Sequence, residues 1–190
     1  RNEDTLKAEE IKFTYADQTA YPPPASRLIY DCEAMIWLND SIFLFTKNRT
    51  NPYNGMCYVY ALPARPGTYK ADLKDSVYLG GSIKELSWIA AADYKNGKLA
   101  LLGYNTLHLF SAFSSTNFFS ADYTSYNLGG ITQKESICFI PELPNTFYIA
   151  DEKYIGGPNL YLFNLQSSRV ERYKNPFNVK IKPHCFEVKD

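Results

Sequence analysis

The stretch DCEAMIWLNDSIFLFTKN at residues 31–48 consists of two apolar runs joined by a short polar turn. Two later stretches follow the same plan: WIAAADYKNGKLALLGYN at 88–105 and KESICFIPELPNTFYIADEKY at 134–154. The tight turns of the three lie at 39–40, 96–97 and 144–145. Asn-Gly between apolar runs favours a type I′ hairpin, because both residues tolerate positive φ. We therefore predict three β-hairpins of one design.

Each hairpin is followed by two further strand-like runs. The third run of each unit is apolar: CYVYALPA at 57–64, TLHLFSAF at 106–113 and NLYLFNL at 159–165. The fourth run is more polar: DSVYLGG at 75–81, TSYNLGG at 124–130 and RVERYK at 169–174. Four strands per unit, graded from apolar to polar and repeated about every 45–50 residues, are typical of the blades of a β-propeller.

The predicted fold class is therefore all-β, a partial β-propeller in a single domain over 1–190. We expect four-stranded blades at the following ranges: 31–81, 88–130 and 134–174. The run EEIKFTY at 9–15 is predicted to be the outer strand of a preceding blade, and the tail at 175–190 has room for a closing strand. Propellers use about four to eight blades. The ring then needs self-association, a second chain or further upstream blades to close.

The composition supports the all-β class. Aromatic residues make up 16% of the chain, with 16 Tyr and 12 Phe against two Met, and flat aromatic side chains favour strands. Many short strands with turn signals also fit a β-sandwich. The recurring Leu-Gly-Gly and the repeated grading of the strands favour the propeller.

Charge and cysteine content exclude several classes of function. Lys plus Arg and Asp plus Glu number 20 each, so no net field attracts nucleic acid. No run approaches the roughly 18 apolar residues of a membrane span. Four cysteines lack the CxxC spacing of a zinc ribbon or a redox site, and both buried thiols and disulfides stay open for them: Cys32, Cys57, Cys138 and Cys185.

Carboxylates recur near the start of the predicted inner strands, which line the channel of a propeller. Aligning DCEAMIWL with QKESICFI places Glu33 over Glu135. In the second blade the matching residue is either Ala91 or Glu85, depending on the register. Asp31 stands two residues before Glu33, at the same mouth.

A second acidic pair, Asp151 and Glu152, ends the second strand of blade three and aligns with Lys47-Asn48 and Tyr104-Asn105. Carboxylates delivered by separate blades suit calcium, which takes six to eight oxygen ligands in irregular geometry. We predict a calcium site at the channel mouth from five residues: Asp31, Glu33, Glu135, Asp151 and Glu152. The alternative is that these side chains bond to neighbouring backbone and hold blade to blade.

Other chemistry is sparse. His108 alternates with leucines on a predicted strand, and His184 adjoins Cys185 near the end of the chain, which is weak evidence for a metal ligand. The sequence has no GxSxG, HExxH or phosphate-binding glycine loop. No catalytic residue is therefore identified. The many tyrosines suit packing between blades or stacking on a sugar ring.

The order DCEAM, SIFLFTKN, CYVYALPARPGTY, WIAAADY with LALLGY, and KESI with YIADEK resembles a group of predicted secreted β-propeller proteins of Bacteroidetes. These look distantly similar to the SdiA-regulated and phytase-like propellers. The likeness covers 9–165 and implies an exported or cell-surface protein with further blades upstream. Its acidic positions match Asp31, Glu33, Glu135 and Glu152.

Two functions are expected from these features. The first is an exported or cell-surface binding or scaffold module that holds calcium and takes an unknown protein or glycan ligand. The second is a calcium-assisted hydrolase of phosphoesters or lactones, as the phytase-like resemblance implies, although the sequence shows no basic cluster for a phosphate.

Overall fold

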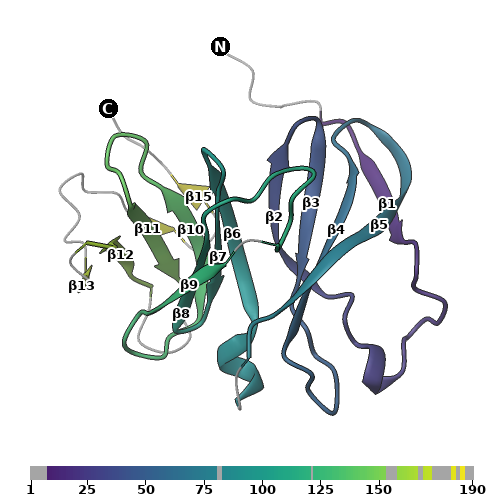
Figure 1. Cartoon of the computed structure of the whole chain (residues 1–190), viewed down its shortest axis with the longest axis horizontal. Helices are drawn as coiled ribbons and strands as arrows, with labels where there is room; N and C mark the ends of the chain where they lie inside the picture. The colour runs from purple at the N-terminus through teal and green to yellow at the C-terminus, as the bar shows by residue number, and fades with distance from the viewer. Residues whose placement is uncertain are drawn as a thin grey trace.

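The computed structural model describes residues 8–80, 83–120, 122–152, 158–166, 169–172, 181–182 and 185–186. Its regular structure is built from β-strands, which form three main sheets set side by side (Figure 1). The helical segments of the described part are two short 3-10 turns, Ala25–Arg27 and Lys84–Ser87. Within these ranges no helix has the length and apolar character needed to cross a membrane.

Three antiparallel meanders make up the sheets, and we call them blades one, two and three. Blade one has β2 Cys32–Leu38, β3 Ser41–Thr46, β4 Met56–Pro63 and β5 Gly67–Tyr78. Blade two has β6 Ile89–Lys95, β7 Lys98–Gly103, β8 Thr106–Phe110 and β9 Tyr123–Asn127. Blade three has β10 Lys134–Phe139, β11 Thr146–Asp151, β12 Leu160–Asn164 and β13 Arg169–Arg172. The predicted unit of four strands is thus repeated three times.

The N-terminal strand differs from the prediction. β1, Ile11–Tyr15, pairs in parallel with Gly67–Ala71 of β5, so it is a fifth strand of blade one and not part of a preceding blade. β5 is the outer strand of the meander, and its outer edge would otherwise present unpaired N–H and C=O groups. In the tail, β14 Ile181–Lys182 pairs with β15 Cys185–Phe186, while 173–174 of the predicted fourth run lie outside the described residues.

The hairpin turns confirm two of the three predicted geometries. Asn39 and Asp40 have φ of 49° and 57°, and Asn96 and Gly97 have φ of 51° and 79°, as a type I′ turn requires. The third hairpin turns over 140–145 instead of over two residues, with Asn145 at φ 56°. The reason is Pro144, whose ring restricts φ to negative values and excludes it from a type I′ turn.

The core lies between the blades. One apolar cluster joins blades one and two, with Ala34 and Phe45 against Leu101 and Phe110, and another joins blades two and three, with Leu102 against Phe147. The first strands are neighbours, β2 beside β6 and β6 beside β10. This packing brings residues at the start of each blade to one shared inner edge.

Candidate functional site

A β-bulge presents the two aligned glutamates. In blade one Cys32 pairs with Thr46 and Ala34 with Phe45, so Glu33 has no partner of its own. In blade three Lys134 pairs with Asp151 and Ser136 with Ala150, which leaves Glu135 in the same position. A bulge residue is released from the ladder, so its side chain can be directed away from the regular alternation of the strand. The predicted match of Glu33 with Glu135 is therefore seen in the register.

The structure resolves the ambiguity in blade two. Ile89 pairs with Gly103 and Ala91 with Leu102, so the bulge residue is Ala90. Both predicted candidates, Ala91 and Glu85, are wrong, because a bulge adds a residue that sequence alignment alone does not locate. Blade two thus contributes no carboxylate at this position.

The observed register also differs by one residue from the predicted alignment of the second acidic pair, Asp151 and Glu152, with the other two blades. The strand partners at the bulge are Thr46, Gly103 and Asp151. The next residues along the chain, Lys47, Tyr104 and Glu152, are therefore the equivalent ones. The predicted alignment of Asp151 with Lys47 is therefore wrong, because Asp151 is equivalent to Thr46.

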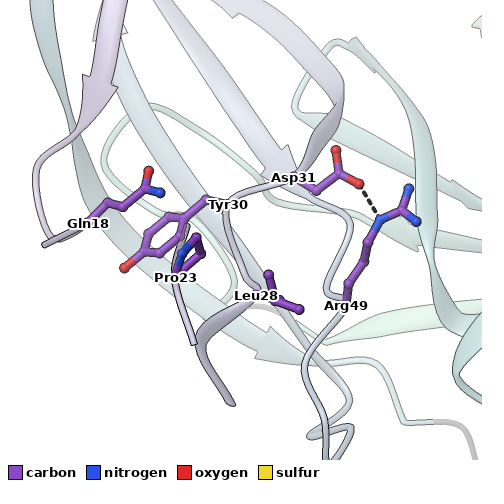
Figure 2. Close-up of a pocket in the computed structure, with 6 residues that line it drawn as sticks. All are labelled: Gln18, Pro23, Leu28, Tyr30, Asp31 and Arg49. Carbon is purple, nitrogen blue, oxygen red and sulfur yellow. Dashed lines mark hydrogen bonds and ion pairs between the residues drawn. The ribbon is translucent and has the colours of Figure 1, made fainter. Parts of the chain in front are cut away.

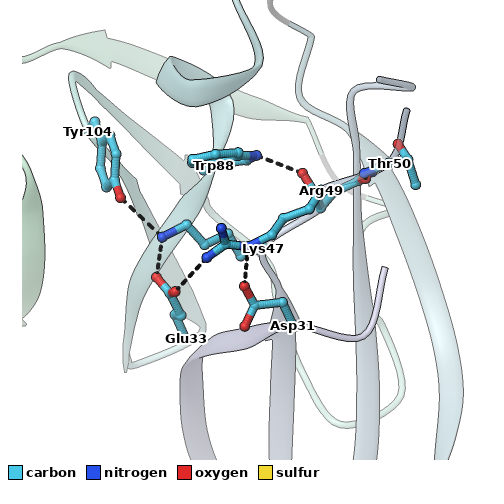
Figure 3. Close-up of polar contacts among 8 residues, drawn as sticks. Asp31, Glu33, Lys47, Arg49, Thr50, Trp88 and Tyr104 are labelled. Carbon is cyan, nitrogen blue, oxygen red and sulfur yellow. Dashed lines mark hydrogen bonds and ion pairs between the residues drawn. The ribbon is translucent and has the colours of Figure 1, made fainter. Parts of the chain in front are cut away.

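Lys47 is the centre of the polar cluster at the inner edge (Figure 3). Its side chain is only 4% exposed, and its Nζ donates to Glu33 Oε2 at 2.5 Å and to Tyr104 Oη at 3.0 Å. The Nζ also lies 5.2 Å from the ring centroids of Trp88 and Tyr104. Burial would lower the pKa of Lys47, but the hydrogen bonds to Glu33 and Tyr104 outweigh it and raise the pKa. Lys47 is therefore a fixed positive charge between blades one and two.

Arg49 forms the second half of this cluster. Its guanidinium is paired with Asp31 and lies 3.4 Å from Glu33 Oε1, with its Cζ 4.9 Å from the Trp88 ring centroid. The Trp88 indole N–H donates to the backbone oxygen of Asn48 at 2.7 Å, which fixes the ring against blade one. A shallow pocket of about 200 Å³ lies beside the pair of Asp31 and Arg49, between the turn after β1 and the 3-10 segment (Figure 2).

Glu135 lies within electrostatic range of this cluster. Burial raises its pKa, and the nearby carboxylates of Glu33 and Glu152 act in the same direction, while a hydrogen bond from Gln133 and the charge of Lys47 oppose it. Neither Glu135 nor Glu152 forms an ion pair within the described part of the chain. Blades one and three therefore bring Glu33, Lys47, Glu135 and Glu152 together.

Asp151 is not part of this cluster and has a structural role within blade three. It is 6% exposed and accepts hydrogen bonds from the Asn159 backbone N–H at 2.5 Å and the Tyr161 hydroxyl at 2.8 Å. Its strand partner Lys134 is also buried, and its Nζ donates to the backbone oxygens of Tyr104 at 2.9 Å and Gly130 at 3.0 Å. Burial lowers the pKa of Lys134, which Asp151 partly offsets. Lys134 therefore ties blade three to blade two, whereas Asp151 holds β11 to the start of β12 within blade three.

The five predicted ligands do not fit a calcium ion as they are arranged. Asp31 and Glu33 are already neutralised by Arg49 and Lys47, and Asp151 is held by hydrogen-bond donors. Among the residues that the structure describes, no three His, Cys, Asp or Glu side chains lie where they could hold a metal ion. The calcium site stays a prediction without support from this geometry.

The cations and the aromatic rings of this cluster are not predicted from the sequence. Lys47, Arg49, Trp88 and Tyr104 were not named as members of the site. The Lys-Asn pair after an apolar strand was a usable signal, because a charge that directly follows buried residues often needs a partner. The partners come from another blade, and sequence spacing cannot show that.

His108 and the cysteines lie outside this site. His108 is buried, and its Nδ1 lies 2.8 Å from Ser125 Oγ across the strands β8 and β9. Burial lowers the pKa of His108 to about 4. Cys32, Cys57 and Cys138 are free thiols, whereas the side chains of His184 and Cys185 are outside the described part.

Comparison with known proteins supports the fold. The chain matches the structure of the Neurospora crassa Pan2 WD40 domain with a TM-score of 0.51 and 9% sequence identity, over 84% of this chain and 44% of that one. No protein-family model matches the sequence, and no curated protein matches it. The class that the sheets and this match define is an all-β, β-propeller-like fold, which confirms the predicted fold class. The chain spans less than half of the Pan2 domain, so its three blades form an arc and not a complete ring of that kind.

Proposed function

We propose that this chain is a binding or scaffold module whose inner edge receives a positively charged group of a protein partner. The observation that supports the proposal is the balance of charge among the side chains at the inner edge. Lys47 and Arg49 are matched by Glu33 and Asp31, so among the described residues Glu135 and Glu152 remain as an excess of negative charge. A cation placed between them would relieve the repulsion that helps to raise the pKa of Glu135.

The chemistry favours an arginine or lysine side chain over the alternatives. A metal ion would need at least a third acidic ligand or another strong donor, which this edge lacks among the described residues. A sugar would need a free ring to stack on, but the rings of Trp88 and Tyr104 already contact Lys47 and Arg49. Calcium remains the second candidate from the sequence. The hydrolase alternative has no observation in its favour, and the exported location rests on the sequence resemblance alone.

The test is a fluorescence titration that uses Trp88 as the reporter. The second tryptophan, Trp37, is replaced in a Trp37→Phe background. The probes are an acetylated tetra-arginine amide, the matching tetra-glutamate peptide and calcium chloride. We expect the arginine peptide alone to change the emission of Trp88, with an affinity that falls as the salt concentration rises.

A matched pair of variants locates the binding. Glu135→Gln should lower the affinity for the arginine peptide by about tenfold, as expected for the loss of one charge-assisted contact. Glu142→Gln removes an equivalent charge from an exposed turn of blade three and should leave the affinity unchanged. Equal weakening in both variants, or no response to the peptide, would refute the proposed ligand. A response to calcium alone would replace it with the metal site.

A further inference from the structure

A second pocket lies away from the inner edge, between the outer strands of blade two and the link that joins blade one to blade two. Its volume is about 290 Å³. Pockets that bind small molecules measure roughly 300 to 1,000 Å³. This pocket is therefore of a size for a small molecule.

One wall of the pocket is polar and comes from blade two. Leu107 on β8 is buried in the core shared with blade three. Its neighbours Thr106 and His108 therefore point to the other face of the sheet, toward blade one. Ser125 on β9 is the strand partner of His108, and Asn105 directly precedes β8. We call Asn105, Thr106, His108 and Ser125 the polar wall.

The opposite wall is apolar and comes from the link between the blades, which runs along the bottom of Figure 1. Leu79 follows β5 and packs on the core between blades one and two, and Ile83 and Leu86 belong to the second 3-10 turn and its start. We call these three residues the apolar wall. The Tyr123 hydroxyl donates to the backbone oxygen of Tyr78 at 3.0 Å, which holds β9 against the end of β5.

The lining of the pocket carries no charge. Among the described residues that line it, none is Asp, Glu, Lys or Arg. His108 is 5% exposed, and burial lowers its pKa to about 4, so its ring is neutral at neutral pH. An ion placed here would lose its water without gaining an opposite charge, which is costly. The lining therefore selects an uncharged ligand.

The hydrogen bonds of the polar wall show which groups are available to a ligand. The Thr106 hydroxyl donates to Asn105 Oδ1 at 2.9 Å, so its oxygen is left as an acceptor. The Asn105 Nδ2 group has no acceptor among the described residues and is a free donor. Ser125 Oγ lies 2.8 Å from His108 Nδ1 and keeps a lone pair. One amide donor beside two hydroxyl acceptors is complementary to a primary carboxamide, whose oxygen accepts and whose nitrogen donates.

We propose that this pocket binds a small uncharged molecule with an apolar body and a primary carboxamide. The carboxamide oxygen accepts from Asn105, and its nitrogen donates to the hydroxyls of Thr106 and Ser125. The body of the ligand lies on the apolar wall. This site does not depend on the cationic ligand proposed for the inner edge, so Glu135→Gln should leave its affinity unchanged.

The test is isothermal titration calorimetry of the full chain with three probes of one shape. Benzamide is uncharged, benzoate is an anion and benzamidine is a cation. We expect saturable binding of benzamide in the millimolar range. Benzoate and benzamidine should bind at least about tenfold more weakly, because the pocket offers neither ion a counter-charge.

A matched pair of variants locates the binding. Thr106→Val keeps the shape of the side chain but removes its hydroxyl, and should lower the affinity for benzamide by about fivefold, as expected for one neutral hydrogen bond. Thr124→Val makes the same change on β9. Thr124 is exposed and alternates with Ser125, so it lies on the other face of the sheet, and its replacement should leave the affinity unchanged.

Ile83→Asp tests the apolar wall. Ile83 is 55% exposed, so the variant should fold, and the added carboxylate should lower the affinity for benzamide at least about tenfold. A wild-type chain that shows no saturable binding of benzamide would overturn the proposal. Equal affinities for benzamide and benzoate, or equal losses in Thr106→Val and Thr124→Val, would also overturn it.

Discussion

At the scale of single residues, the predicted acidic site is in the structure a cluster of carboxylates, cations and aromatic rings. The sequence points to Glu33 and Asp31 because carboxylates recur at the start of the inner strands. The contacts show that each is already paired, Glu33 with Lys47 and Asp31 with Arg49. A buried lysine requires such partners, since an unpaired charge in the interior is costly. Glu135 and Glu152 form no ion pair with the residues that the structure describes, which leaves them as the available negative charges of the predicted set.

His108 provides a prediction on pH. Burial lowers its pKa to about 4 in the folded chain, from 6.5 for the ordinary side chain. The unfolded state therefore binds more protons between these values, and stability is lost as the pH falls from 6.5 toward 4. Urea unfolding of the wild type should show this loss, on the order of 3 kcal/mol from His108.

The variant His108→Gln should remove this part of the pH dependence, so its free energy of unfolding should change less between pH 7 and 4.5. Ser125→Ala is the control, because burial and not the hydrogen bond to Ser125 lowers the pKa. It should keep the slope of the wild type. An unchanged slope in His108→Gln would contradict the assignment.

At the scale of elements, turns and bulges decide which residues reach the inner edge. The type I′ turns at Asn39-Asp40 and Asn96-Gly97 fix the register of two hairpins, and this was readable from the sequence. The bulges were not, because an unpaired residue leaves no pattern in the composition of a strand. They place Glu33, Ala90 and Glu135 at equivalent positions.

A substitution at Gly97 tests whether the type I′ turn between β6 and β7 needs a residue that tolerates positive φ. Its φ is 79°, and an added Cβ would meet no atom within 4 Å. The cost of Gly97→Ala should therefore be backbone strain alone, about 1 kcal/mol of unfolding free energy. Gly130→Ala, also in open space but without a positive φ, should change stability by less than about 0.5 kcal/mol. Urea denaturation gives the unfolding free energy of both variants. Equal losses in the two variants would contradict the explanation by backbone strain.

At the scale of the whole molecule, stability comes from the interfaces between blades. Phe113 is 1% exposed and sits among Phe43, Phe45 and Tyr94, with ring centroids at 6.0, 6.0 and 6.3 Å. These rings belong to both blade one and blade two, so one side chain joins the two sheets. Blades that share a core in this way should unfold together.

Phe113→Ala should lower the unfolding free energy by about 3 kcal/mol or more, because it leaves a cavity between two blades. The transition in urea should stay single, since both blades lose the same contact. Ile131→Ala is the control at an exposed position, 56% accessible, and should cost less than about 1 kcal/mol. Two separate transitions in Phe113→Ala would show that the blades unfold independently.

Local sequence patterns were enough to predict the local architecture: three meanders of four strands, two type I′ turns and the all-β class. These features follow from alternation and turn chemistry, which act between residues close in the chain. The tertiary structure decided the fifth strand of blade one and the partners of Glu33 and Asp31. It also decided which face of β2 stays exposed. Edge pairing, ion pairing and burial join residues far apart in the chain, so the stacking of blades sets them and no local pattern records them.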